Sequence, residues 1–307
     1  MPQSTIMNQP SSDLSNSPEQ ARRVRAAQQI ADACPPTLCD EIALTGSTAR
    51  GLADADSDLE INLWSDALPP LELRRAWLEA AGVQDIEADF TPRSDGAFRM
   101  AGWWNEGDEQ PFEIEFNWQT YESMEALVTS LTGDAAPSVP HRHLTVGELL
   151  TTARPLRTTG RLSAWQARLA EHSQALRDAL TGQALTLWRD AARHEMTLRL
   201  MRRGERLSLT ARLIDDLNAL MRLLYAINRR YEPSAKWTIT LARRLPIQPD
   251  HLEARLNAAL DGDESGVRAA YELIADTLRL LTPTPERDAA LAEIQRVLTS
   301  LSLPEST

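Results

Sequence analysis

Lysine is almost missing from this 307-residue chain, which has one lysine, Lys236, against 31 arginines. Its two cysteines, Cys34 and Cys39, are too few for a structural zinc site, and no disulfide is expected without an export signal. No apolar run reaches the roughly 18 residues of a membrane-spanning helix, which argues against a membrane partner. The polar segment 1–17 lacks the apolar centre of a signal peptide, so we expect a disordered tail on a cytoplasmic protein.

Basic residues of any kind are scarce in the first half of the chain. Residues 1–150 hold 9 arginines against 25 acidic residues, a net charge of −16, whereas residues 151–307 carry +4. A nucleic-acid surface needs Lys and Arg to displace counterions, so this acidic half argues against a nucleic-acid partner. It favours a site that collects metal ions or a cationic substrate, although a merely solvated acidic surface is the alternative.

Hydrophobic periodicity in the first part of the chain predicts an α/β domain with a small mixed sheet. Leu59, Ile61 and Leu63 alternate with polar residues, which is the period of a half-buried strand. Three- and four-residue spacing, Pro and Gly mark the helices. The expected elements are helices at 18–33 and 69–81 and strands at 41–45, 59–63, 83–89, 98–104 and 112–118, with a turn at 105–108 between the last two strands.

Beyond Gln119 nearly every segment has helical periodicity. Helices are expected at 162–180, 184–203, 208–231, 250–260, 267–281 and 289–301. The fold class is therefore α+β, an α/β domain followed by a helical bundle domain. The expected boundaries are 1–17 for the tail, 18–132 for the α/β domain, 133–145 for a connecting loop that contains His141 and His143, and 146–307 for the helical domain.

Two acidic residues share one face of the strand that begins near residue 59. Asp58 and Glu60 are two residues apart, so their side chains point to the same side. Two close carboxylates disfavour each other's ionisation unless a cation lies between them, and Mg²⁺ prefers such hard oxygen ligands. Gly46-Ser47, directly after the strand at 41–45, would let the backbone approach a phosphate. Together these residues predict a triphosphate site with a metal ion.

A second acidic strand, which would carry a third carboxylate, follows at 112–118. Glu113, Glu115 and Asn117 share one face of it, and if this strand pairs beside the Asp58 strand, another carboxylate reaches the same centre. Two metal ions could then be bridged.

This pattern resembles the DNA polymerase β-like nucleotidyltransferase superfamily, and most closely the kanamycin nucleotidyltransferase-type enzymes that adenylylate small molecules. Gly46-Ser47, ten residues, then Asp58-Leu59-Glu60 fits the family's first motif. Ile114-Glu115-Phe116-Asn117-Trp118 fits its hydrophobic–Glu–hydrophobic–Asn–aromatic strand. The resemblance covers residues 41–118 and implies that Asp58, Glu60 and Glu115 are the metal ligands. It also implies that 18–132 is the catalytic domain and that the helical domain assists it.

Further residues enter as candidates. Arg50 and Lys236 could bind the nucleotide phosphates, and each could equally be an ordinary surface side chain. The resemblance implies a general base from the helical domain, but no motif selects it. The candidates are Asp190, Glu195, Asp215, Asp216 and, outside that domain, Glu113.

The expected activity is Mg²⁺-dependent transfer of a nucleoside monophosphate, AMP from ATP, to a hydroxyl of a small, cationic acceptor, with release of pyrophosphate. Gly46, Ser47, Arg50 and Lys236 would bind the nucleotide. Three alternatives stay open: adenylylation of a partner protein as in an antitoxin, transfer to an RNA 3′ end, and nucleotide sensing without catalysis. The sequence leaves the acceptor, the base preference and a homodimeric assembly open.

Overall fold

The computed structural model describes residues 17–107, 110–133 and 139–302. The chain forms two compact units. Residues up to Thr129 and Leu149–Ala170 form the first, which we call the sheet unit, and Ser130–Glu148 with the residues after Ala170 form the second, the helical unit. The tail expected at 1–17 lies outside the described residues except for its last residue, as does the end of the turn expected at 105–108.

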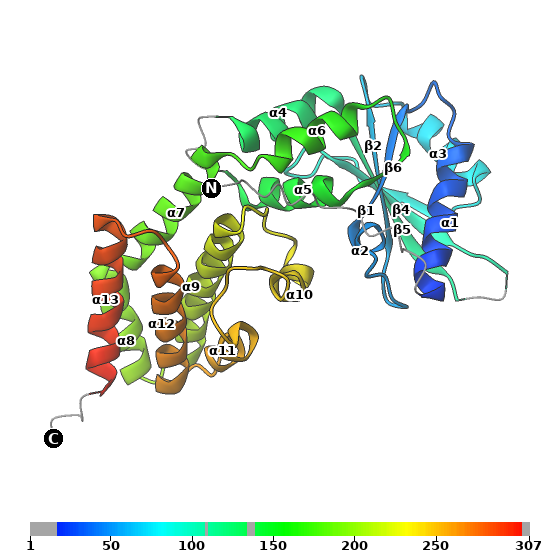
Figure 1. Cartoon of the computed structure of the whole chain (residues 1–307). Coiled ribbons are helices and arrows are strands. Elements are labelled where there is room, and N and C mark those ends of the chain that lie inside the picture. The colour runs from blue at the N-terminus through cyan, green and yellow to red at the C-terminus, as the bar shows by residue number, and fades with distance from the viewer. Residues whose placement is uncertain (1–16, 108–109, 134–138, 303–307) are drawn as a thin grey trace. The chain divides into compact units, whose positions relative to one another are not determined.

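The sheet unit contains both strands and helices (Figure 1), and the five strands expected from the sequence are present in the expected order. Its strands are β1 (Glu41–Thr45), β2 (Leu59–Ser65), β3 (Gln84–Ala88), β4 (Phe98–Trp104), β5 (Phe112–Thr120) and β6 (Arg154–Arg157). Its helices are α1 (Pro18–Ala33), α2 (Gly46–Arg50), α3 (Leu71–Ala80) and α6 (Arg161–Ala170). Two helices, α4 (Tyr121–Thr132) and α5 (His141–Thr152), continue from one unit into the other.

The six strands form one mixed sheet in the order β3-β4-β5-β2-β1-β6. Among the described strands, β2 and β5 are the one parallel pair, and their register pairs Glu60 with Glu115 and Asn62 with Asn117. β1 pairs antiparallel with β2, which places Thr45 opposite Glu60. Because residues directly opposite one another on neighbouring strands point to the same face, the polar positions of three strands gather on one side of the sheet.

The other face of the sheet is apolar and is covered by α1 and α3. Trp77 of α3 packs edge-on against Phe116 and Trp118, with ring centroids 5.9 Å and 5.7 Å apart. The remaining buried contacts of this face come from alternate strand residues and from α1: Ile42, Leu44, Leu59, Ile61, Leu63, Ile114, Ala26, Ala27 and Ile30. This burial explains the period-2 pattern of β2 and β5.

One end of the polar face is closed by α6. Trp165 packs edge-on against Trp64 at 5.5 Å between ring centroids. The fully buried Glu41 carboxylate accepts hydrogen bonds from both the amide and the hydroxyl of Thr159, at 2.8 and 2.7 Å, and from the Leu162 amide at 3.2 Å. Because these amides lie at the start of α6, Glu41 ties that helix to β1. The carboxylate pair of β2 and β5 lies toward the other end.

The edge strand β6 is absent from the elements expected from sequence, which contain only helices after β5. Arg154–Arg157 pairs antiparallel with β1, and Pro155 is tolerated because an edge strand needs no donor on its outer side. Arg157 also donates to the carbonyls of Cys39 and Ala31, at 3.1 and 2.8 Å. Tertiary pairing therefore makes a strand of four residues that have no β periodicity.

The helical unit contains α7 (Gln174–Trp188), α8 (Ala191–Arg202), α9 (Arg206–Ile227), α10 (Thr238–Ala242), α11 (Leu252–Ala258), α12 (Glu264–Arg279), α13 (Pro285–Ser302) and the 3₁₀ turn η1 (Ala235–Trp237). Two expected helices, at 162–180 and 184–203, are each interrupted. Ser173 accepts the Leu176 amide at 3.4 Å, and Asp190 accepts the Ala192 amide at 3.0 Å, so each side chain caps a new helix. In contrast, α5 begins at His141, where a loop was expected.

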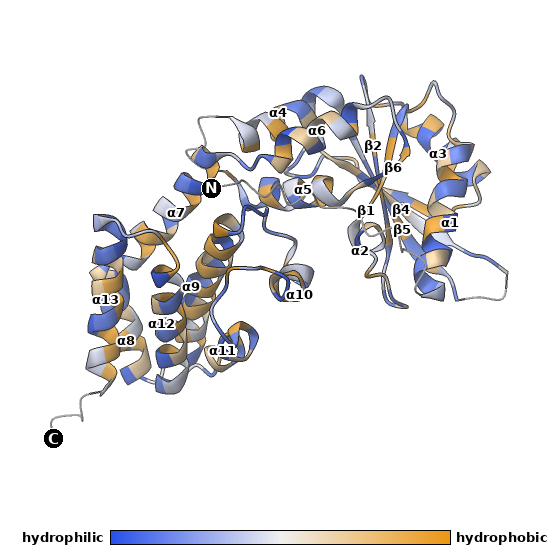
Figure 2. Cartoon of the chain, in the orientation of Figure 1, coloured by the Kyte–Doolittle hydropathy of each residue, from blue (hydrophilic) through white to orange (hydrophobic). Residues whose placement is uncertain are grey.

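Apolar stripes of α7, α9, α12 and α13 form the core of the helical unit. Figure 2 shows the apolar residues running along α9 and α12. Buried Leu213, Leu217, Leu220 and Leu224 of α9 illustrate the expected three- and four-residue spacing. Within residues 17–107, 110–133 and 139–302, every helix is too short or too polar to cross a lipid bilayer.

Buried His172 makes the stability of the helical unit depend on pH. Burial lowers the pKa of His172 to about 4, from an ordinary value of 6.5. Its Nε2 lies 3.2 Å from the Arg230 carbonyl, and its ring packs on Tyr231. The folded-state pKa of His172 is below its unfolded-state value, so folding favours the neutral ring. The contribution of neutral His172 to the free energy of unfolding is complete above pH 6.5 and is lost as pH falls toward 4, a change of roughly 3 kcal/mol.

We therefore expect the free energy of unfolding, measured by urea denaturation, to fall less steeply between pH 7 and pH 4 in His172→Asn. Asn tolerates the left-handed backbone at this position, where φ is 43°. His251→Asn is the matched control, because His251 is exposed and has a φ of 57°. Equal slopes in wild type and His172→Asn would show that His172 does not carry this effect.

Candidate functional site

The turn after β1 lies directly against the Glu60 carboxylate. Gly46 has a φ of +67°, and a Cβ built on it would lie 1.8 Å from Glu60 Oε2. Only glycine therefore fits here, both because of the left-handed backbone and because of the close carboxylate. The Gly46-Ser47 turn and the first acidic strand, twelve residues apart in sequence, are thus neighbours in space.

Glu60 and Glu115 are lateral neighbours on the parallel strands β2 and β5. Their side chains lie on the same face of the sheet, roughly 5 Å apart at Cβ as expected for paired strand residues. Asp58 immediately precedes β2, two residues before Glu60, and both carboxylates are half-buried. The structure therefore brings the strand of Asp58 and Glu60 beside that of Glu115, as the sequence analysis requires.

The Glu115 carboxylate is fully engaged by neighbouring donors. Arg93 Nη1 donates to Oε1 at 3.0 Å, and Arg99 Nε donates to Oε2 at 2.7 Å. Asn117 Nδ2 donates to Oε1 at 3.0 Å, and Arg93 Nη2 lies 3.3 Å from Oε2. Burial alone would raise the pKa of the Glu115 carboxyl, but the hydrogen bonds from Arg99, Arg93 and Asn117 outweigh it and hold this pKa below its ordinary value.

Two hydroxyls of α2, the short helix that begins at Gly46, are buried. Ser47 is 3% exposed and Thr48 is fully buried, and neither hydroxyl has a hydrogen-bond partner among the residues that the structure describes. A buried hydroxyl without a partner costs free energy, so it is commonly satisfied by a ligand or by water. Ser47 follows Gly46 directly, so its hydroxyl is a candidate contact for a bound anion.

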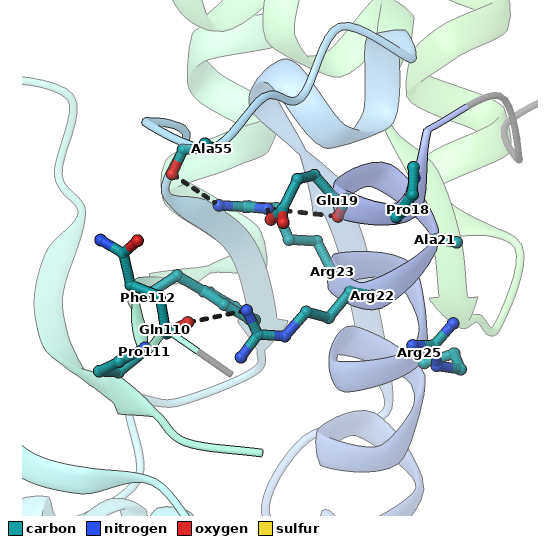
Figure 3. A pocket seen from close by; sticks show the side chains of 10 residues that line it. All are labelled: Pro18, Glu19, Ala21, Arg22, Arg23, Arg25, Ala55, Gln110, Pro111 and Phe112. Carbon is teal, nitrogen blue, oxygen red and sulfur yellow. Dashed lines mark hydrogen bonds and ion pairs between the residues drawn. The ribbon is translucent and has the colours of Figure 1, made fainter. Parts of the chain in front are cut away.

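Side chains of α1 hold the segment that joins Ser47 to Asp58. Gln20 Nε2 donates to the Thr48 carbonyl at 2.6 Å, and the Ala53 amide donates to Gln20 Oε1 at 3.2 Å. Arg23 Nε donates to the Ser57 carbonyl at 2.9 Å, and its Nη2 reaches the Ala55 carbonyl (Figure 3). Both side chains are buried. They therefore position the backbone on either side of the predicted site.

The same part of α1 borders a cavity of about 330 Å³ that is floored by Phe112. Arg22 and Arg23 both stack on the Phe112 ring, and Arg22 Nη1 donates to the Gln110 carbonyl at 2.7 Å (Figure 3). These guanidinium groups thus join α1 to the start of β5 and to the loop before β2. The α1 and β5 residues that line this cavity therefore help to hold the acidic strands in place.

Loss of the Gln20 contacts is expected to weaken the attachment of α1 to the segment between Ser47 and Asp58 and so to lower the free energy of unfolding. Gln20→Ala leaves the Ala53 amide without its buried partner, which costs about 1–3 kcal/mol. It also removes one of two donors to the Thr48 carbonyl, which keeps its hydrogen bond from the Gly51 amide at 3.2 Å. Urea denaturation should show this loss, whereas Gln28→Ala, an exposed residue of the same helix, should change stability by less than about 0.5 kcal/mol. Equal stability of the two variants would contradict a structural role for Gln20.

Comparisons with known proteins concern mainly the second half of the chain and the overall fold. A family model described as a domain of unknown function (DUF4037) matches residues 150–238. No curated protein matches the chain. Among solved structures, a nucleotidyltransferase-like protein from Exiguobacterium sibiricum 255-15 is similar, with 14% identity, a TM-score of 0.33, and coverage of 92% of this chain and 89% of that chain.

The oxygen donors of this site suit a hard cation only in part. Among the described residues, no three His, Cys, Asp or Glu side chains are grouped so as to hold a metal ion. Asp58 and Glu60 supply carboxylate oxygens of the kind that Mg²⁺ binds. Glu115 has its lone pairs directed to arginine and asparagine donors instead. Asp58 and Glu60 therefore have the donor chemistry that a hard cation needs, whereas Glu115 would bind one only after it exchanges a partner.

The remaining predicted residues are distributed over both units. Arg50 ends α2, in the sheet unit, whereas Lys236 lies in η1 of the helical unit, and the roles predicted for both stay predictions. Among the base candidates, Asp190 caps α8, buried Asp216 pairs with Arg193 at 3.0 Å, and Glu195 lies 3.6 Å from Arg202. Asp215 is exposed, and Glu113 pairs with Arg99 at 2.8 Å. These contacts give each candidate except Asp215 a structural partner.

Arg93 and Arg99, which both donate hydrogen bonds to Glu115, are not among the site residues predicted from the sequence. Arg99 lies opposite Asn117 in the β4–β5 register, which places it on the carboxylate face. A signal for Arg99 exists in the sequence, because it occupies a polar position of the strand expected at 98–104. Arg93 lies in the loop before β4, where no periodicity shows which way its side chain points.

Proposed function

We propose that this chain is a Mg²⁺-dependent nucleotidyltransferase that moves a nucleoside monophosphate, AMP from ATP, onto a hydroxyl of a small, cationic acceptor and releases pyrophosphate. The observation that carries the proposal is the lateral pairing of Glu60 with Glu115 beside the Gly46-Ser47 turn. The turn and the two carboxylates come from three separate segments of the chain, and their proximity supports a shared site.

Asp58 and Glu60 would hold the metal ion, which supplies charge neutralisation on the triphosphate when it is bound. Glu115 is the third carboxylate of the proposal. The Ser47 hydroxyl, buried and without a protein partner among the described residues, would donate to a phosphate oxygen. The glycine before it lets the backbone approach that phosphate closely. Positioning and charge stabilisation would then provide most of the rate enhancement.

A cationic acceptor is favoured by the charge of the catalytic half. Residues 1–150 carry a net charge of −16. Such a surface attracts cations and repels polyanions, which makes a small basic compound a better acceptor than RNA.

Pyrophosphate release tests the activity. The full chain with Mg²⁺ should release pyrophosphate from one or more of the four nucleoside triphosphates when the correct acceptor is present. The acceptor panel comprises aminoglycosides, cell extract and tRNA, and labelled α-phosphate should appear in the acceptor. Nucleotide binding without pyrophosphate release under any of these conditions would support a nucleotide sensor and overturn the transferase.

A further inference from the structure

Arg93 is held against the Glu115 carboxylate by a hydrogen-bonded loop, residues 93–97. Its amide donates to the Ala97 carbonyl at 2.8 Å, and the Gly96 amide donates back to the Arg93 carbonyl at 2.9 Å. The Asp95 carbonyl accepts a hydrogen bond of 2.7 Å from Gln119 of β5. The loop backbone is therefore anchored to the same strand face that carries Glu115, and it places the guanidinium on that carboxylate.

The hydrogen bonds of Glu115 leave little room for another ligand. Each carboxylate oxygen accepts two hydrogen bonds, and Arg93 supplies one to each oxygen. A carboxylate oxygen has about two acceptor sites, so a metal ion can bind Glu115 only if a donor leaves. Arg99 is also tied to Glu113 at 2.8 Å, and Asn117 is a buried residue of β5 itself. Arg93 has a longer second contact, 3.3 Å to Asn117 Oδ1, but it reaches from a loop and is 33% exposed. Arg93 is the donor that can leave most easily.

We propose that Arg93 changes partners when the nucleotide binds, a step that rests on the proposed function. In the nucleotide-free protein its guanidinium occupies Glu115. Two oxygens of a phosphate group can accept the same bidentate pair of hydrogen bonds from a guanidinium as a carboxylate, so the guanidinium passes to the triphosphate and frees an acceptor position on each Glu115 oxygen. Arg93 is then a phosphate-binding residue, and its transfer couples cation binding to nucleotide binding.

This exchange predicts effects of opposite sign on two affinities. Without Arg93, each Glu115 oxygen loses one of its two donors and the carboxylate loses a competing positive charge, so a divalent cation alone should bind more tightly. The nucleotide loses a charged hydrogen-bond donor and should bind more weakly. A charge-assisted hydrogen bond contributes about 1.5–3 kcal/mol, so each affinity should change by about ten-fold or more.

Binding measurements on the full chain test the proposal without any turnover. Mn²⁺ affinity is measured by electron paramagnetic resonance, alone and with α,β-methylene-ATP, and the affinity for this analogue is measured by calorimetry. Arg93→Gln is the main variant and Arg93→Ala the second, with circular dichroism as the check on folding. Arg25→Gln, an exposed arginine of α1, is the matched control and should leave both affinities unchanged.

The expected result is tighter Mn²⁺ binding and weaker analogue binding in both Arg93 variants. If wild type releases pyrophosphate and binds the analogue, but the Arg93 variants change neither affinity or weaken both, the exchange is wrong and the transferase stands. If wild type binds neither Mn²⁺ nor the analogue, the proposed function fails and the exchange fails with it.

Discussion

Asp58→Asn and Glu60→Gln are each expected to lower nucleotidyl transfer by at least about a hundred- to a thousand-fold while leaving the protein folded. Both substitutions keep the size and polarity of the side chain and remove only the charge that would hold a cation. Both carboxylates are half-buried rather than part of the core, so the free energy of unfolding should change by less than about 1 kcal/mol. Pyrophosphate release and thermal denaturation measure the two quantities.

Two neighbouring carboxylates provide matched controls for charge alone. Asp56→Asn alters an exposed residue two positions before Asp58, and Glu87→Gln alters an exposed residue of β3 in the same sheet. Neither should change pyrophosphate release by more than about two-fold, since neither belongs to the proposed site. Near-full activity of purified Asp58→Asn or Glu60→Gln would refute the metal assignment.

Gly46→Ala is expected to be the most damaging small substitution in the sheet unit. The added Cβ would lie 1.8 Å from Glu60 Oε2, so the carboxylate or the turn must move by an ångström or more. A displacement of about 1 Å can cost roughly a hundred-fold in rate. The left-handed φ of +67° costs a further 1–2 kcal/mol or so for any residue with a Cβ.

Gly204→Ala separates these two causes. Gly204 has a φ of +68°, and nothing lies within 4 Å of its would-be Cβ, so this variant carries the backbone strain without the clash. It should lose stability by about 1 kcal/mol and keep its activity. If Gly46→Ala resembles Gly204→Ala in both pyrophosphate release and urea denaturation, contact between Gly46 and Glu60 has no functional consequence.

Much of the sheet unit could be predicted from local pattern alone. The helix at Pro18–Ala33 and the strand at Glu41–Thr45 match the expected bounds. The strand under Glu60 was expected from the alternation of Leu59, Ile61 and Leu63, because one face of it packs against a core and the other does not. Period and capping act over a few residues, so they can be read without the tertiary structure.

Helix ends in the second half were harder to predict. Apolar spacing continues through His172-Ser173 and through Arg189-Asp190, so two pairs of helices looked continuous. The breaks depend on the side chains of Ser173 and Asp190, which accept hydrogen bonds from the first amides of the next helix. In the sequence, a polar residue within an amphipathic pattern looks the same whether it caps a helix or faces solvent.

The sequence by itself determined which residues are candidates for chemistry: Gly46-Ser47, Asp58, Glu60 and Glu115 follow from spacing and resemblance. Only the tertiary structure decided that Glu60 and Glu115 are neighbours, that β6 closes the edge beside β1, and that Arg93 and Arg99 occupy Glu115. The physical reason is the separation along the chain between the segments that interact. Strand register and loop placement depend on hydrogen bonds between segments far apart in the chain, and no local periodicity encodes them.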